Sequence, residues 1–253
     1  MLTSRQIDDF KRDGILILRG FFPDEDAARW RREVSDYFEA PTDGDSWRAA
    51  LRIHKSDSFH LSDDPTPRSH PGLAALYGSL HAGGQWDGAN ELVMRAASEQ
   101  ARWLGARAPH LDFPLYTSVR TLANNVIYLS DVGEQGGAFM YWPGSHRIAW
   151  DYFRRNPLDY FSRGERGQDA TFGLLSREMI CEPIEFTGRA GDLLIWHSLT
   201  LHSGSVNKSE QTRYALVCRW GIDRGTEPIY DFDQDMWRYW DFAPVREYEE
   251  AQA

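Results

Sequence analysis

The sequence predicts a mainly β protein, an all-β barrel or jelly roll, with α-helices added at its N-terminal end. Short apolar runs separated by Gly, Pro, Asp and Asn turns dominate the chain after residue 90. Clear helical patterns occur only in the first 80 residues. A chain of 253 residues, 42% of them hydrophobic, is long for one domain but within the range of a barrel or sandwich enzyme.

Local signals define the N-terminal elements. The residues Thr3-Ser4-Arg5-Gln6 have the spacing of a capping box, and Gly14 is suited to the left-handed cap that ends a helix. The apolar run 15–18 predicts a buried strand, and Asp24 or Asp26 can cap a second helix. The apolar side chains of this second helix recur at steps of three and four, and they are Ala27, Trp30, Val34, Tyr37 and Phe38.

Further along the chain, residues 41–70 are rich in Asp, Ser and Pro and predict a loop around a short strand at 50–53. Residues 73–80 predict a third helix. Residues 91–97 have helical propensity, but their place before a loop with Gly and Pro and before the HLD triplet favours a strand. The remaining predicted strands are the apolar runs 126–129, 138–142, 184–186, 193–196 and 214–220.

We expect a single domain, residues 1–253, because neither an internal repeat nor a domain linker is recognisable. Its helical part covers roughly residues 1–90, its β core roughly 91–222, and an acidic, aromatic tail roughly 223–253. The tail is expected either across the mouth of the barrel or against a second subunit, so a monomer and a homodimer both remain open.

Composition excludes several classes of partner. A net charge of -10 argues against nucleic acid, and no apolar run approaches the length of a membrane span. Cys181 and Cys218 are too few for a disulfide scaffold or a zinc cluster, and no apolar signal segment follows Met1. The interpretation is a soluble cytoplasmic protein.

Ten tryptophans and eleven tyrosines exceed the needs of a core, so some are expected to line a pocket for a small molecule.

A candidate metal site begins at His110-Leu111-Asp112. In an extended strand, residues two apart project from the same face, so His110 and Asp112 can reach one ion. A third ligand from a distant strand would complete one face of an octahedron, and two histidines with one carboxylate suit Fe(II) oxygenases. A lone His-x-Asp triplet is just as typical of a polar loop, so this pair alone does not establish a site.

Four segments occur in a specific order along the chain. They read LTSRQIDDFKRDGILILRGFF, HLD, NNVIYLSDVGEQGGAFMYWPGSHR and GDLLIWHSLTLHSGSVNKSEQTRYAL. Because it has these segments in this order, the chain resembles the phytanoyl-CoA dioxygenase family of Fe(II)/2-oxoglutarate oxygenases. The resemblance covers most of the chain and implies a double-stranded β-helix, the jelly-roll barrel of cupin-like proteins.

The resemblance implies that His110, Asp112 and His202 bind Fe(II), with 2-oxoglutarate and O₂ as cosubstrates. It also implies that Arg213, eleven residues after His202, holds the distal carboxylate of 2-oxoglutarate, which a planar guanidinium matches in a bidentate pair. The implied reaction releases succinate and CO₂ and oxidises a C–H bond of a small molecule. Asp112 favours hydroxylation over halogenation, while desaturation, epimerisation and ring closure remain open.

Other cosubstrate contacts are implied less specifically. Tyr128 lies where relatives place an aromatic residue beside the cosubstrate, and core packing is the equally weighted alternative. Lys55 resembles a basic family position, although the loop around it favours a solvated lysine. The chain has Ser203-Gly204-Ser205 where the family often has Gly-Ser-Gly, so either serine is a candidate contact.

The substrate pocket has the weakest signals. Three arginines near the HLD triplet, Arg102, Arg107 and Arg120, are candidates for an anionic substrate, with ordinary surface positions as the alternative. A possible aromatic wall consists of Trp103, Phe113, Tyr116 and Trp142. His146 and His197 are interpreted as packing residues. The alternative function is a non-catalytic or differently metallated jelly-roll protein that binds a small molecule.

Overall fold

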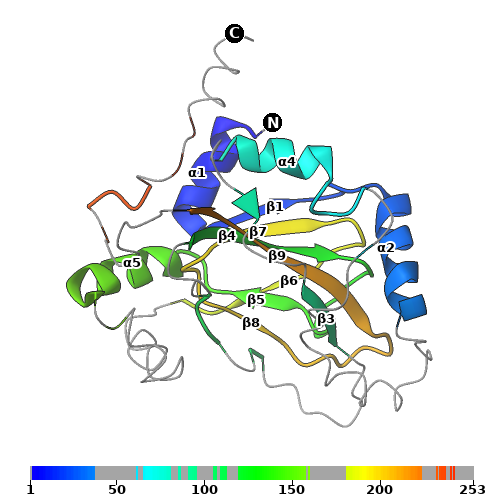
Figure 1. Ribbon diagram of the computed structural model, residues 1–253. Helices are drawn as coiled ribbons and strands as arrows, with labels where there is room; N and C mark the ends of the chain where they lie inside the picture. Colours follow the sequence, from blue (N-terminus) through cyan, green and yellow to red (C-terminus); the bar gives the residue numbers. More distant parts are fainter. Residues whose placement is uncertain are drawn as a thin grey trace.

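The computed structural model describes residues 2–37, 61, 65–80, 85–86, 91–95, 105–106, 109–112, 119–157, 159, 181–223, 232, 234–237, 240 and 242. Within these ranges a large antiparallel sheet carries helices on one face and a small sheet on the other (Figure 1). The protein is therefore mainly β with flanking helices, as predicted.

The first helix, α1 (Ser4–Asp13), forms where the capping box predicts it. The Thr3 hydroxyl accepts a hydrogen bond from the Gln6 amide at 3.2 Å, and the Gln6 side chain accepts one from the Thr3 amide at 2.9 Å. Gly14 ends the helix with a φ of 72°, the left-handed conformation that glycine adopts without strain.

Two more helices also follow the sequence pattern. Helix α2 (Asp24–Tyr37) buries Ala27, Trp30 and Val34, three members of the predicted apolar stripe. Helix α4 (Pro71–Gly78) begins two residues earlier than predicted, because the His70 side chain accepts a hydrogen bond from the Gly72 amide and caps it. The strand predicted at 50–53 lies outside the described residues.

The large sheet has the order β1-β7-β4-β9-β2 among the described strands, with β3 also paired to β9. Every pairing in it is antiparallel. The strands are β1 (Ile15–Leu18), β2 (Gln85–Trp86), β3 (Glu91–Arg95), β4 (Val119–Tyr128), β7 (Leu193–His197) and β9 (Arg213–Asp223).

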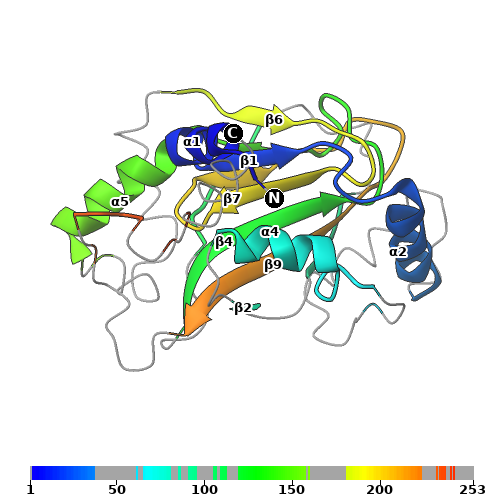
Figure 2. The same ribbon diagram turned by 90° about the horizontal axis from the view of Figure 1, so that it is seen from above.

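The two faces of this sheet bury different cores, because side chains alternate along each strand. Ile127, Ile195 and Leu216 pack in one cluster with residues of the N-terminal helices, and Figure 2 shows α1 and α4 over this outer face. Their strand neighbours Val126, Leu194 and Ala215 belong to a second cluster on the inner face. A residue that contributes to a site between the two sheets must therefore occupy an inner-face position on its strand.

The small sheet lies against the inner face of the large sheet. Its strand order is β6-β5-β8. Its strands are β6 (Ile184–Phe186), β5 (Phe139–Tyr141) and β8 (His202–Gly204). Phe139, Tyr141 and Phe186 point into the core between the sheets. In the part of the chain that the structure describes, the two sheets stay separate and form no closed barrel.

Several elements differ from the sequence predictions, among them the short strand β2 (Gln85–Trp86), which had not been predicted. Strand β4 starts seven residues before the predicted run at 126, since its polar residues Asn124 and Asn125 are buried rather than in a turn. Helix α5 (Ser145–Arg155) had not been predicted and begins inside the Pro-Gly-Ser-His segment. Strand β8 had not been predicted either, because only three residues form it.

The described tail residues pack on the chain itself. Phe232 contacts Trp150 and Phe153 of α5, with ring centroids 5.0 and 5.4 Å apart. Trp240 lies 5.3 Å from the ring of Phe10 on α1. None of the helices in the described ranges is long and apolar enough to span a bilayer.

Candidate metal centre

His202 stands at the start of β8, after a tight loop that leaves β7. Thr200 in this loop donates its hydroxyl to the Gly14 carbonyl at 3.1 Å, and the Leu201 amide donates to the Ser145 hydroxyl at 2.8 Å. The end of α1 and the start of α5 therefore hold the loop from two sides, and the position of His202 depends on both.

His110 pairs with His202 through the backbone. The His110 amide donates to the His202 carbonyl at 2.9 Å, and the His202 amide donates back at 3.1 Å. This is an isolated bridge, so the extended strand expected for the HLD triplet is reduced to one paired residue. Leu111 turns away into an apolar cluster with Trp142, while His110 and Asp112 face the same centre.

The side chains of His110, Asp112 and His202 converge. One donor atom from each lies within 4.8 Å of the other two. Nε2 of His202 is 3.3 Å from Oδ2 of Asp112, and Nε2 of His110 is 3.9 Å from Oδ1. Two imidazole nitrogens and a carboxylate at this spacing can share one ion.

Neighbouring groups orient the ligand atoms. The Asn124 amide donates to Oδ2 of Asp112 at 2.6 Å. Nδ1 of His202 lies 2.9 Å from the Thr200 carbonyl, so it carries the proton and leaves Nε2 with a free lone pair. Such partners fix the tautomer and ring orientation of histidines in metal sites.

The electrostatics suit a cation. Burial lowers the pKa of His202 to about 4, although the Asp112 carboxylate acts in the opposite direction, so this imidazole is neutral near pH 7. Burial by itself raises the pKa of Asp112, but electrostatic interactions with His202, Arg219 and His110 outweigh it and hold the pKa below its usual value. A neutral imidazole and an ionised carboxylate are the forms that bind metals.

The three side chains are buried to different extents. The exposed fraction is 6% for His202 and 12% for Asp112, against 34% for His110. The centre is thus closed on the His202 side and open beside His110. Its donor set fits Fe(II) and leaves room for further ligands on the open side.

Arg213 and Tyr128 lie together on the inner face of the large sheet. Arg213 is buried, with 4% of its surface exposed, and its charge acts on the Tyr128 hydroxyl. That hydroxyl donates to the Phe186 carbonyl at 2.7 Å and accepts from the Phe139 amide at 3.0 Å. Burial raises the pKa of Tyr128 to about 12, so the group stays neutral. The hydrogen bonds of Tyr128 tie the two sheets together beside Arg213.

Other predicted site residues are placed elsewhere. Ser203 pairs with Met140, and strand alternation puts it on the face of β8 opposite to the His202 ring. Ser205, two residues on, hydrogen-bonds the Glu185 side chain. A contact from either serine to 2-oxoglutarate stays a prediction. Trp142 is buried with Leu111 behind the ligands.

The remaining predicted contacts fall outside what the structure describes. Arg120 belongs to β4, but its side chain lies outside the described part. The same holds for the whole residues Lys55, Arg102, Trp103, Arg107, Phe113 and Tyr116.

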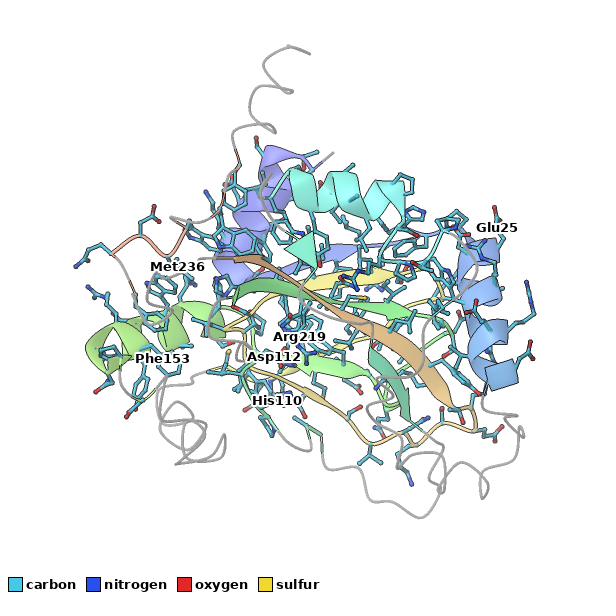
Figure 3. The ribbon with its side chains drawn as sticks, in the orientation of Figure 1. Glu25, His110, Asp112, Phe153, Arg219 and Met236 are labelled. Carbon is cyan, nitrogen blue, oxygen red and sulfur yellow. The ribbon has the colours of Figure 1, made fainter. Side chains whose placement is uncertain are left out.

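Two residues at the centre were missed from the sequence. Asn124 resembles a turn residue in the polar stretch before the apolar run of β4, and Arg219 resembles a surface cation late in β9. Both occupy inner-face positions and are paired in register across β4 and β9. Figure 3 shows Arg219 next to Asp112, with His110 close by. Alternation along β9 was the one sequence signal that could have identified Arg219.

His146 and His197 lie away from the triad. Their rings are 5.4 Å apart, and the His197 ring stacks on Trp240. Nδ1 of His197 accepts from the Leu199 amide at 3.1 Å. His197 ends β7 and His202 begins β8. Both His146 and His197 pack between α1, α5 and the tail.

Comparison with known proteins gives the family. The model for phytanoyl-CoA dioxygenase (PhyH) matches residues 10–215, most of the chain. The chain belongs to this family. The match begins in α1 and ends in β9, so this PhyH protein has the HLD triplet, His202 and Arg213 within the family region.

Individual relatives are distant. An ectoine dioxygenase of Bordetella parapertussis is 24% identical over 237 residues, which covers 84% of this chain and 73% of the relative. The solved structure of SnoN, a non-haem α-ketoglutarate-dependent epimerase from nogalamycin biosynthesis, matches with a TM-score of 0.56 at 18% identity, covering 87% of this chain and 82% of SnoN. The carbocyclase SnoK of the same biosynthesis matches with a TM-score of 0.56 at 15% identity, covering 89% and 88%.

PhyH proteins are Fe(II)- and 2-oxoglutarate-dependent dioxygenases that use O₂. The protein is accordingly a 2-oxoglutarate-dependent non-haem iron dioxygenase. The convergence of His110, Asp112 and His202 is consistent with that class.

Proposed function

We propose that this PhyH protein hydroxylates an unactivated C–H bond of a small molecule, with His110, Asp112 and His202 as the ligands of its iron. The observation that carries the proposal is the triad, in which three donor atoms lie within 4.8 Å of one another. Asn124 and the Thr200 carbonyl orient two of these side chains before any ion arrives.

Iron together with 2-oxoglutarate and O₂ supplies the oxidising power, with release of succinate and CO₂. The protein binds and orients the reactants. Arg213 holds the distal carboxylate of 2-oxoglutarate as a bidentate partner, in a place that excludes water. Tyr128 supports this pocket from its side, through the hydrogen bonds that fix its ring between the sheets.

The substrate enters from the open side, where His110 is exposed. A small molecule suits a PhyH protein whose relatives include an ectoine dioxygenase. The similarity to an epimerase and a carbocyclase concerns the fold alone. The type of oxidation must therefore be determined from the chemical structure of the product.

The proposal extends to the architecture. The large and small sheets form the two halves of a double-stranded β-helix, with the core at roughly residues 91–222 inside one domain of 1–253. A single cooperative unfolding transition by calorimetry is expected for one domain. Two separate transitions would contradict it.

The first test is binding without oxygen. Fe(II) and 2-oxoglutarate added to the wild-type protein should give a weak visible absorption band. His110→Ala and His202→Ala should lose the band and the metal, while circular dichroism shows an unchanged fold. His197→Gln is the matched control, since His197 lies outside the triad, and it should keep the band.

The second test identifies the reaction. Succinate release is screened across amino acids, acyl-CoAs, terpenoids and polyketides, and the product of any active compound is analysed by mass after reaction under ¹⁸O₂. Hydroxylation predicts one labelled oxygen in the product. No band and no succinate with any compound would favour the non-catalytic small-molecule binding protein instead.

A further inference from the structure

Trp196 is the residue of strand β7 that faces the metal centre. It belongs to the core cluster between the two sheets and is almost fully buried. Across the strands it pairs with Asn124, which donates the 2.6 Å hydrogen bond to Asp112. Directly paired residues have neighbouring side chains on one face of a sheet. The indole of Trp196 and the amide of Asn124 therefore lie on the same side of the sheet as Asp112.

The indole ring also contacts a second ligand of the triad. The ring centroids of Trp196 and His202 are 5.0 Å apart. The ring of Phe139 lies 4.6 Å from that of Trp196 and 5.3 Å from that of His202, so the three rings pack on one another. Trp196 is thus in contact with the His202 imidazole and adjacent in the sheet to the donor that holds Asp112.

The indole N–H of Trp196 is a buried donor. Its Nε1 has no acceptor that meets the distance and angle of a regular hydrogen bond. The group nevertheless acts on Asp112: burial raises the pKa of this carboxyl group, and the Trp196 side chain is among the neighbours that lower it. Because a buried N–H that makes no hydrogen bond is costly, we expect an acceptor for it in the working site. The Asp112 carboxylate is the acceptor toward which the N–H already acts.

Metal binding gives a reason for that hydrogen bond to be completed. Nε2 of His110 is 3.9 Å from Oδ1 of Asp112. Neighbouring ligand atoms on an octahedral ion, with bonds of about 2.1 Å, lie about 3 Å apart, so these two atoms approach each other by roughly 1 Å when they share an ion. The carboxylate of Asp112 shifts or turns in this step, and its interaction with the indole N–H changes with it.

The way in which Asp112 binds an ion decides what else can bind. An octahedral ion held by two histidines and one carboxylate oxygen keeps three positions open, enough for the two donor atoms of a 2-oxo acid and for O₂. A carboxylate that binds through both of its oxygens leaves one position too few. Hydrogen bonds to a carboxylate oxygen occupy its lone pairs, and they therefore disfavour the binding of that oxygen to the ion.

We propose that Trp196 is a positioning residue of the metal centre: its indole N–H donates to Asp112 when the ion is bound and, together with Asn124, keeps this carboxylate on the ion through a single oxygen. This inference rests on the proposed function. It gives the Trp196 N–H the task of keeping the position for O₂ open, which an aromatic ring without a donor cannot perform.

The first experiment removes the N–H and keeps an aromatic ring. Full-length wild type and Trp196→Phe are titrated anaerobically with Fe(II), then saturated with 2-oxoglutarate and titrated with nitric oxide, which takes the position of O₂ and is followed by electron paramagnetic resonance. Trp196→Phe should bind Fe(II) more weakly, on the order of tenfold, as expected when a partner that orients a ligand is lost. Its loaded sites should also bind nitric oxide more weakly, because the second oxygen of Asp112 competes for the same position.

The affinity for nitric oxide distinguishes positioning from packing. If the Trp196 ring served only to pack the core, Trp196→Phe would lower the melting temperature and leave nitric oxide binding by the loaded sites unchanged, and that result would overturn the inference. Trp30→Phe is the matched control, since Trp30 is a buried residue of α2 whose Nε1 donates to the Pro65 carbonyl at 3.1 Å. It should match the wild type in both affinities. An equal loss in Trp30→Phe would also overturn the inference.

A measurement on the wild type does not depend on the folding of a variant. The indole N–H signals are observed by ¹H–¹⁵N spectroscopy after ¹⁵N labelling, with Zn(II) as a diamagnetic substitute for iron. Mn(II) identifies the signal of Trp196 by strong broadening, because this ring contacts His202. Zn(II) should move the same signal to lower field, as a hydrogen bond to a carboxylate forms. A Trp196 signal that Zn(II) leaves in place would contradict the role proposed for its N–H.

The outcomes separate this inference from the proposed function. A wild type that gives the visible band with Fe(II) and 2-oxoglutarate, together with a Trp196→Phe variant of equal affinity for Fe(II) and nitric oxide, would overturn the role of Trp196 alone. A wild-type protein that binds no metal and gives no band would overturn both.

Discussion

The Asn124 amide lies 2.6 Å from Oδ2 of Asp112, the same oxygen that stands 3.3 Å from Nε2 of His202. One side chain of the large sheet therefore sets the orientation of the only carboxylate in the triad. Asn124 is fully buried, so its hydrogen bond does not compete with water.

Replacement of Asn124 by alanine should weaken metal binding by roughly ten- to a hundredfold, the usual effect of losing a partner that orients a ligand. The reason is that Asp112 would lose its donor and become free to rotate. Titration of Fe(II) or Co(II) into the apoprotein measures this. An unchanged metal affinity would show that Asn124 does not orient the ligand.

Asn125 is the matched control, because it is adjacent in sequence but faces the helices. Its Oδ1 accepts a 2.7 Å hydrogen bond from the buried Tyr77 hydroxyl of α4. Asn125→Ala removes this acceptor and should lower the free energy of unfolding by about 1–3 kcal/mol. Denaturant unfolding should show the loss, and metal titration of the folded variant should match the wild type. A variant with weakened metal binding and normal stability would contradict the assignment of faces.

Gly14 should not tolerate a side chain. Its φ is 72°, and an added Cβ would overlap the His146 ring and lie 2.6 Å from the Thr200 hydroxyl oxygen. The left-handed conformation alone costs a non-glycine residue about 1–2 kcal/mol, so Gly14→Ala should lower the melting temperature by several degrees. Because Thr200 precedes His202 in the loop, the folded fraction should also bind metal less tightly. The control is Gly20→Ala, which has a φ of 57° but open space at its Cβ and should show the smaller loss.

His146 should make stability depend on pH. Burial lowers its pKa to about 4, while the unfolded chain keeps a value near 6.5. Between pH 4 and 6.5 the unfolded state binds more protons than the folded state. The contribution of His146 to the free energy of unfolding is therefore present above pH 6.5 and is lost as the pH falls toward 4. The full effect is roughly 3 kcal/mol, at 1.36 kcal/mol per pKa unit.

Urea unfolding of the apoprotein at several pH values measures this dependence. His146→Gln keeps a donor for the Lys11 carbonyl, which Nε2 of His146 meets at 3.1 Å, but does not titrate. The variant should therefore lose less stability than the wild type between pH 6.5 and 4. His202 titrates in both proteins, so its contribution cancels in the comparison. Equal slopes would show that His146 is not the group involved.

Hydrophobic periodicity and turn residues were sufficient to predict much of the fold. The capping box of α1, the stripe of α2 and the run of β7 depend on neighbours in sequence, and each was found close to its predicted place. Helix α5 had no comparable signal, because its start coincides with the Pro-Gly turn before it. A barrel was predicted, but the two described sheets stay separate; closure depends on contacts between distant residues, which local patterns do not encode.

The residues of the candidate site likewise fall into two groups, those that the sequence predicted and those that it did not. His110, Asp112 and His202 could be named because their order and spacing resemble a family pattern, and the structure brings them together. Asn124 and Arg219 could not be named, because their relation to Asp112 comes from the register between β4 and β9. A shift of one residue in that register would turn both side chains toward the helices.

The backbone bridge between His110 and His202 also has a consequence for the order of folding. It joins segments some ninety residues apart, and β1 reaches its partner β7 only after most of the chain is available. Pairings this distant close slowly, since chain entropy is lost before contacts compensate. We therefore expect iron to bind late in folding: in refolding experiments, metal capture should appear with the slowest phase and report completion of the native state.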